Sequence, residues 1–392
     1  MSSKIPVHGE CDPRFAKLRE VFEDSFASTP ELGAAVAVTI DGEPVIDLFG
    51  GYLDTARTKE WERDTIVNVY STTKGMTAIC AHRLVEEGRL DLDAPVAQYW
   101  PEFAAAGKET IPVRWLLSHQ AGLPGIEKRL SKEDLLDWGR MTSALAEQKP
   151  WWEPGTKHGY HAMTFGHLVG EVVRRIDGRS LGSYFREEVA EPLGLDFHIG
   201  FGPEHDARVS DLHSSPRVDP STIPEGPIRD MMEQMSDPST LMGAAMGNPA
   251  LGEGTHNTRE WRTAEIPAAN GHGSARALAR VYGALSVGGD LDGVHVLSKE
   301  AIERAIQEQA FGPDAVLGGM PMRFGLGFML RQDMMPMGPN ARAFGHPGAG
   351  GSIGFADLDA RVGFGYVMNQ MQQGIAGSAN AFRMIGELFE AL

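Results

Sequence analysis

A serine and a lysine stand three residues apart in the stretch NVYSTTKGMTA, as Ser71 and Lys74. The stretch begins a segment with helical periodicity, so both side chains project from one face of the first helical turn. The positive end of the helix dipole and burial both disfavour a charged lysine and lower its pKa. A neutral amine beside a hydroxyl can take its proton, which would make Ser71 an activated nucleophile with Lys74 as its base.

Two other interpretations of the serines compete with this one. An ordinary helix start would also explain S-x-x-K, because serine is a preferred N-cap residue. A G-x-S-x-G pattern, typical of α/β-hydrolases, occurs at residues 350–354 with Ser352 at its centre. That fold places its acid and its histidine after the serine, whereas His346 is the last histidine of this chain. The residues after Ser352 also have the pattern of a strand, not of the helix that should follow. We therefore expect Ser71 to be the nucleophile.

The length of the chain indicates how many domains it forms, and its charge excludes some classes of partner. At 392 residues the chain exceeds what one hydrophobic core usually supports. A formal net charge of −17 disfavours binding to nucleic acids and to anionic membranes. Residues 1–22 contain no apolar core of an export signal, and no run is long enough to span a bilayer. We predict a cytoplasmic protein with no nucleic-acid or membrane partner, and the sequence leaves the oligomeric state open.

Cysteines and histidines do not form the pattern of a metal site. The two cysteines, Cys11 and Cys80, lack a C-x-x-C partner, so we expect reduced structural thiols. Three histidines cluster between residues 158 and 167 but lack the spacing and the carboxylate of H-E-x-x-H: His158, His161 and His167. His119 is expected to support a loop by hydrogen bonding. We expect no metal and no cofactor.

Periodicity along the chain predicts an α+β fold. A helix over 12–28 precedes two β-branched strands joined at Asp41-Gly42, a signal for a two-residue hairpin. Further helices are predicted at 72–87, 112–118, 132–146, 163–177 and 180–189. After a helix from residue 274, strands return, with a buried hairpin around Asp359-Ala360 and a final helix over 378–391. We expect one antiparallel sheet built from both chain ends, covered by the terminal helices, with a mainly helical lobe inserted.

This pattern predicts a discontinuous domain of residues 1–71 and 271–392, and an inserted helical domain of residues 72–270. Within the insertion, residues 196–270 have little periodicity and are rich in Pro, Gly and Met. Methionine fills irregular gaps, so core filling is the first interpretation and a pliable acyl pocket is the second. The Met-rich segments 229–246 and 311–337 are expected to shape the substrate pocket.

Several stretches, in their order, resemble the serine β-lactamases and penicillin-binding proteins, in particular the class C-like branch that includes the family VIII carboxylesterases. They are VYSTTKGMTA, LVEEGRLDLDAPVAQYWPEF, VRWLLSHQAGLPG, residues 151–185, GSARALARVYGAL and FGHPGAGGSIGFAD, and the similarity runs over residues 30–370. The resemblance implies a β-lactamase/transpeptidase-like fold. It makes Tyr160 the start of a second motif, sharing the proton of Ser71 with Lys74. It also implies a third motif at 346–348 and an oxyanion hole between the N–H groups of Ser71 and Ala349.

Two departures from the family pattern bear on the substrate. The triplet Tyr160-His161-Ala162 lacks the asparagine that usually ends the second motif, and His346 replaces the lysine that usually begins the third. A lysine offers a permanent charge to a substrate carboxylate, whereas histidine is mostly neutral near pH 7. Both changes favour a neutral ester over an anionic lactam or a D-Ala-D-Ala peptide. Trp151 and Trp152 precede the second motif, where either would wall an acyl or alcohol site or pack in the core.

The sequence thus predicts a serine carboxylesterase that hydrolyses small or medium acyl esters, its small-molecule partner, through an acyl-enzyme on Ser71. Hydrolysis of β-lactams or amides of the D-amino peptidase type, and transacylation, are alternatives on the same site. A non-catalytic scaffold of the same fold is a further alternative, but it would have no physical need for an intact Ser71, Lys74 and Tyr160. The substrate-binding residues expected beside these three are Ala349, Gly348, His346 and Trp152.

Overall fold

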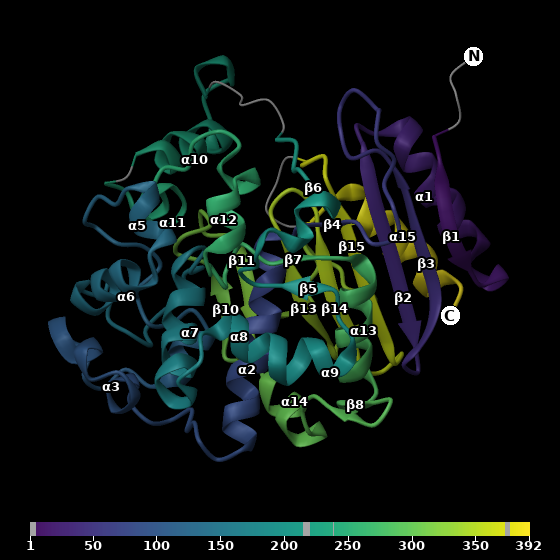
Figure 1. Ribbon diagram of the computed structural model, residues 1–392. Helices are drawn as coiled ribbons and strands as arrows, with labels where there is room; N and C mark the ends of the chain where they lie inside the picture. Colours follow the sequence, from purple (N-terminus) through teal and green to yellow (C-terminus); the bar gives the residue numbers. More distant parts are fainter. Residues whose placement is uncertain (1–4, 215–219, 238, 373–376) are drawn as a thin grey trace.

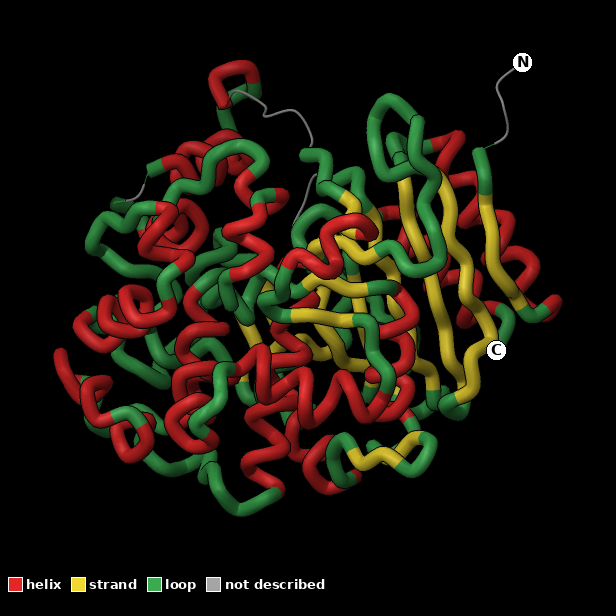
Figure 2. Tube along the Cα trace, viewed as in Figure 1, coloured by secondary structure: helices red, strands yellow, loops and turns green. Residues whose placement is uncertain are grey.

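The computed structural model describes residues 5–214, 220–237, 239–372 and 377–392. A nine-stranded antiparallel sheet in the order β1-β3-β2-β15-β14-β13-β12-β11-β10 forms its strand-rich half (Figures 1 and 2). The strands come from two distant stretches of sequence: β1 (Val7–Cys11), β2 (Gly33–Ile40), β3 (Glu43–Gly51), β10 (Ala310–Pro313), β11 (Pro321–Phe324), β12 (Met329–Leu330), β13 (Ala343–Pro347), β14 (Ile353–Asp357) and β15 (Val362–Met368). The predicted α+β class with an antiparallel sheet is confirmed.

Both predicted hairpins are present in this sheet. Asp41 and Gly42 have φ angles of 52° and 84°, the two positive values that a type I′ turn between β2 and β3 requires. In the second hairpin every residue of β14 and β15 is buried. Strands buried on both faces carry continuous apolar runs, and this is why the two strands could be recognised in the sequence.

Helices cover both faces of the sheet. Figure 1 shows α1 (Ala16–Ser28) and α15 (Ala379–Glu390) together on one face and α13 (Ala275–Ser286) on the other. Ser274 and Ser378 cap α13 and α15, because each side-chain oxygen accepts an N–H from the first helical turn. The predicted helices at these places are confirmed, although residues 13–15 form a 3₁₀ turn ahead of α1.

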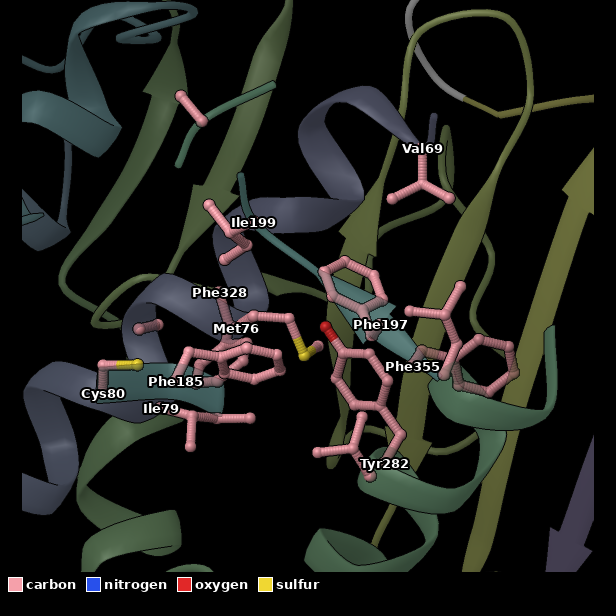
Figure 3. Close-up of a cluster of buried hydrophobic side chains, with 14 of the residues drawn as sticks. Val69, Met76, Ile79, Cys80, Phe185, Phe197, Ile199, Tyr282, Phe328 and Phe355 are labelled. Carbon is pink, nitrogen blue, oxygen red and sulfur yellow. The ribbon is translucent and has the colours of Figure 1, made fainter. Parts of the chain in front are cut away.

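The helix α2 (Thr73–Glu86), predicted at 72–87, runs through the core beside the sheet. All of its residues from Thr73 to His82 are buried. Figure 3 shows three apolar side chains of α2, Met76, Ile79 and Cys80, packed among aromatic and aliphatic side chains of other elements. These neighbours are Phe185, Phe197, Ile199, Tyr282 and Phe328. Gly75 permits this packing, because a Cβ there would lie 2.2 Å from the hydroxyl oxygen of Tyr282. The helix that begins beside Ser71 is therefore held firmly by the core.

The helix-rich half (Figure 2) contains α3 (Val96–Tyr99), α4 (Val113–Leu117), α5 (Lys132–Leu136), α6 (Trp138–Glu147), α7 (Thr164–Asp177), α8 (Leu181–Phe185) and α9 (Glu191–Leu193). The prediction of a single helix at 132–146 is wrong, because the backbone of Asp137 is extended and separates α5 from α6. Its carboxylate accepts the N–H of Arg140 at 2.9 Å and caps α6. The helix predicted at 180–189 continues to Leu193 through a π-helical turn over residues 186–190.

The segment 196–270 is built of short elements, which explains its weak periodicity. It holds β5 (Phe197–His198), β6 (Val209–Ser210), α10 (Pro227–Ser236), α11 (Leu241–Gly247) and α12 (Arg259–Thr263). The two strands join β4 (Ile66–Asn68) and β7 (His272–Gly273) in a small sheet of order β5-β7-β4-β6. The division into domains at residues 71 and 271 stays a prediction. No helix among the described residues combines the length and the apolarity needed to cross a bilayer.

Candidate active site

Ser71 lies in the 3₁₀ turn Tyr70–Thr72, between β4 and the first residue of α2. The preceding Tyr70 has a φ of 44°, in the left-handed region that non-glycine residues rarely adopt. Its phenol lies 3.1 Å from Nδ1 of His256, whose Nε2 faces the carbonyl oxygen of Leu212 at 3.3 Å. The carbonyl can only accept, so Nε2 carries the proton and Nδ1 accepts from Tyr70. Strained backbone of this kind persists where the surroundings hold it, and it clusters at functional sites.

Lys74 is fully buried and has three partners for its amine. Nζ lies 2.7 Å from the carbonyl oxygen of Ala162, 2.9 Å from that of Ala268 and 3.0 Å from Oγ of Ser71. Burial lowers the pKa of Lys74 well below its usual range. A neutral amine has two hydrogens and one lone pair, and two carbonyls take both hydrogens. The lone pair is then directed at the hydroxyl of Ser71, which is the geometry of a general base.

Tyr160 completes this group. The amine of Lys74 lies 4.9 Å from the centre of the Tyr160 ring. Burial raises the pKa of the Tyr160 phenol, and a side-chain hydrogen bond with Ser71 partly opposes that shift. The phenol is therefore protonated near neutral pH and can pass a proton without carrying a lasting charge. The structure brings the three predicted catalytic residues together.

The turn after β13 lies against the backbone that carries Ser71. A Cβ at Gly348 would come within 2.1 Å of the carbonyl oxygen of Val69, so only glycine permits this approach. Ala349 follows directly in the turn. Over the described ranges, the N–H groups of Ser71 and Ala349 donate to no protein acceptor. Two free N–H groups on neighbouring segments are what an oxyanion hole requires.

His346 is buried beside Tyr160, with its ring stacked at a centroid distance of 6.0 Å. Its Nδ1 lies 2.7 Å from the carbonyl oxygen of Pro347, so Nδ1 carries the proton. Burial, and then the nearby Lys74, lower the pKa of His346 to about 3. The third-motif side chain is consequently a neutral imidazole at pH 7 and offers no positive charge to a substrate.

Ser352 and Trp152 are both buried, and each contacts a neighbour of the candidate site. Oγ of Ser352 donates to the carbonyl oxygen of Val69 at 2.8 Å, and the residue is 1% exposed. It precedes β14 and not a helix, so the G-x-S-x-G interpretation is wrong. Trp152 is mostly buried, and its ring packs against that of His161, next to Tyr160, at a centroid distance of 6.3 Å. Its part in binding an acyl or alcohol group stays a prediction.

Two histidines near Tyr160, His119 and His161, form hydrogen bonds with backbone groups in and around the second motif. Nδ1 of His119 accepts the N–H of His161 at 3.1 Å, as its predicted role in supporting a loop requires. His161 in turn faces the Gly159 carbonyl with Nδ1 at 2.7 Å and accepts the N–H of Leu123 with Nε2 at 3.1 Å. No group of three or more His, Cys, Asp or Glu side chains within the described ranges is arranged to hold a metal ion.

Sequence reasoning missed the backbone carbonyls of Ala162 and Ala268 as partners of Lys74, because a carbonyl has no side-chain signature. It also missed α11, whose Met242 is buried and whose Ala245 joins Tyr160 in one apolar cluster. The element lies in the methionine-rich segment 229–246, and the expectation that this segment shapes the substrate pocket stays a prediction.

A cavity of about 530 Å³ lies apart from these residues, between α13 and the strands β1, β2 and β3. Three arginines line it, and each is bonded to a carboxylate of the protein: Arg63 and Arg276 to Asp47, and Arg280 to Asp292. None of the predicted site residues lines it. This cavity therefore does not compete with Ser71 as the candidate site.

Comparison with known proteins agrees with this geometry. The family model described as Beta-lactamase matches residues 18–385. The esterase/beta-lactamase LipL of Mycobacterium tuberculosis is 38% identical over 368 residues, which cover 93% of this chain and 83% of LipL. A crystal structure of a family VIII carboxylesterase matches with a TM-score of 0.90 and 43% identity, over 99% of this chain and 100% of the other. A penicillin-binding protein homologue from Caulobacter crescentus matches with a TM-score of 0.88 and 40% identity, over 99% and 100% of the two chains. The protein belongs to the Beta-lactamase family, as the order of its motifs predicted.

Proposed function

We propose that the protein is a serine carboxylesterase that hydrolyses small or medium acyl esters through an acyl-enzyme on Ser71. The observation that carries the proposal is the amine of Lys74, whose two hydrogens face carbonyls and whose third position faces Oγ of Ser71. The esterase names of LipL and of the family VIII carboxylesterase support the same reaction class.

In the proposed reaction, Ser71 attacks the ester carbonyl while Lys74 takes its proton. The N–H groups of Ser71 and Ala349 hold the negative oxygen of the tetrahedral intermediate, and loss of one such donor typically costs about 3 kcal/mol. Tyr160 passes the proton to the departing alcohol. Water then attacks the acyl-enzyme by the same proton path and releases the acid, which regenerates Ser71.

A neutral substrate fits the charges around Ser71. His346 stands where the family's lysine would bind a substrate carboxylate, and it is a buried, uncharged imidazole. We expect esters to be preferred over anionic lactams for this reason. Lactam hydrolysis is the second candidate, because the related LipL is named both esterase and beta-lactamase. Faster turnover of a chromogenic cephalosporin than of a short p-nitrophenyl ester would reverse this preference.

Labelling with a fluorophosphonate followed by peptide mapping tests the nucleophile. We expect the added mass on Ser71, no label in Ser71→Ala, and loss of label in Lys74→Ala. The matched control is Ser352→Ala, which should label as the unchanged protein does. Label on Ser352 would refute the assignment, and a folded protein that takes no label and turns over no ester would favour the non-catalytic alternative. We further propose a cytoplasmic location, which cell fractionation tests.

A further inference from the structure

Asp314 is a completely buried carboxylate that the proposed reaction does not use. It follows β10, and its Oδ1 accepts three backbone N–H groups: from Tyr160 at 3.1 Å, Val316 at 2.8 Å and Leu317 at 2.9 Å. Tyr160 lies 154 positions away in sequence. Three N–H groups from two distant segments converge on this one oxygen, so the side chain of Asp314 ties the second motif to the loop after β10.

The same loop holds Tyr160 in two further ways. The N–H of Ala315 donates to the carbonyl oxygen of His158 at 3.1 Å, which ties the loop to the chain just before Tyr160. Val316, Phe324 and Tyr160 share one apolar cluster, and the rings of Phe324 and Tyr160 are stacked at a centroid distance of 6.4 Å. Backbone and ring of Tyr160 are thus both set by residues 314–324.

The second oxygen of Asp314 faces His158. Oδ2 of Asp314 and Nε2 of His158 lie 3.9 Å apart, and neither has a hydrogen-bond partner among the described residues. Buried polar atoms are normally paired, so a carboxylate with one oxygen left over calls for a reason beyond stability. The other oxygen, Oδ1, accepts the backbone N–H of Tyr160, and Tyr160 must place its phenol beside the hydroxyl of Ser71.

We propose that Asp314 is a positioning residue for Tyr160: its carboxylate fixes the backbone of Tyr160 so that the phenol meets Oγ of Ser71. The inference rests on the proposed function, because it takes Tyr160 to move the proton. Without the carboxylate, the N–H groups of Tyr160, Val316 and Leu317 lose their acceptor and the backbone shifts to find water. A displacement of about 1 Å at a reacting group can lower the rate about 100-fold.

Kinetics of single and double variants test this proposal with a p-nitrophenyl ester. We expect Asp314→Ala to lower kcat about 10- to 100-fold with little change in KM. Asp314→Asn should keep most of the activity, because its amide oxygen accepts the same N–H groups. The matched control is Asp357→Ala: Asp357 is equally buried and accepts two backbone N–H groups, but it lies at the opposite end of β14 from Ser352. That variant should lose stability and keep its kcat.

The decisive measurement repeats Asp314→Ala in the Tyr160→Phe background. If Asp314 acts through Tyr160, the second change lowers kcat little further, whereas a purely structural role gives the full additional loss and overturns the proposal. Asp314→Glu, which keeps the carboxyl group and displaces its oxygens by one methylene, replaces Asp314→Ala in this cycle if the alanine variant does not fold. Full activity in Asp314→Ala with a slow Tyr160→Phe would also overturn it. Full activity in Tyr160→Phe itself would instead refute the role of Tyr160 in the proposed function.

Discussion

Replacing Lys74 with methionine separates the chemistry of its amine from the packing of its stem. Methionine has a similar length and no charge, so the buried space that the lysine stem occupies stays filled. The two carbonyls that accepted from Nζ lose their donor, while Ser71 loses its base. Loss of a general base typically lowers the rate by 10²–10⁴, and we expect a fall of about 10³-fold in kcat.

The same substitution changes how stability depends on pH. Burial lowers the pKa of Lys74 in the folded protein well below the value of 10.5 that an unperturbed lysine has. The unfolded chain therefore binds one more proton at this site, and the free energy of unfolding rises with pH until about the unfolded pKa. The slope approaches about 1.4 kcal/mol per pH unit wherever the folded amine is neutral and the unfolded amine is charged. Lys74→Met should lose this part of the rise.

Urea unfolding at pH 7, 8 and 9, followed by tryptophan fluorescence, measures the slope in both proteins. Lys108 provides the control, since its buried amine donates to the carbonyls of Ala105, Ala146 and Gln148 and contacts no hydroxyl. Burial lowers the pKa of Lys108 to about 8, so Lys108→Met should alter the slope chiefly above pH 8 and leave kcat unchanged. An identical slope in Lys74→Met and the unchanged protein would show that Lys74 stays charged when folded, and it could not then be the base.

Two further predictions concern buried groups away from the reaction. Burial raises the pKa of Glu31 to about 7, while the hydroxyl of Tyr366 and the amide of Asn380 donate to it. The folded protein therefore keeps a proton that the unfolded chain loses above about pH 4.5, and stability falls as pH rises toward 7. Glu31→Gln should remove this fall and be more stable at pH 8 by up to about 3 kcal/mol in thermal or urea unfolding. Ser352→Ala should lose about 2 kcal/mol of stability, because its hydroxyl bonds to both the carbonyl of Val69 and the hydroxyl of Thr72 and each bond is usually worth about 1 kcal/mol. A fall in kcat as large as that of Lys74→Met would contradict its structural role.

Features that depend on local spacing could be predicted from the sequence. Ser71 and Lys74 lie within one helical turn, so their contact follows from helix geometry alone. The turn at Asp41-Gly42 and the buried strands β14 and β15 also follow from short patterns. Tyr160 required the order of motifs along the chain, because nothing within its own segment joins it to Ser71. Short strands with proline or glycine, such as β10, carry too little pattern to be recognised.

Features that depend on distant backbone could not be predicted in this way. Lys74 bonds to carbonyls 88 and 194 positions away, and any residue type supplies a carbonyl. Asp314 accepts a backbone N–H, which every residue except proline carries. The residues around Asp314 also have the composition of an ordinary turn. The break at Asp137 has another cause: the carboxylate caps the next helix, and this local bond outweighs a continuous apolar periodicity.

The two buried lysines show why the acceptor set, and not the residue type, decides the chemistry. Lys108 faces three carbonyls, which can occupy all three hydrogens of an ammonium. Lys74 faces two carbonyls and one hydroxyl, and a hydroxyl can donate as well as accept. With a hydroxyl in place of the third carbonyl, the neutral amine donates its two hydrogens to the carbonyls and accepts the hydroxyl proton on its lone pair. Deprotonation of Lys74 therefore leaves no buried group unpaired. A helix start that reads S-x-x-K becomes a base and nucleophile when the fold supplies two carbonyls from elsewhere, and in this chain Ala162 and Ala268 supply them.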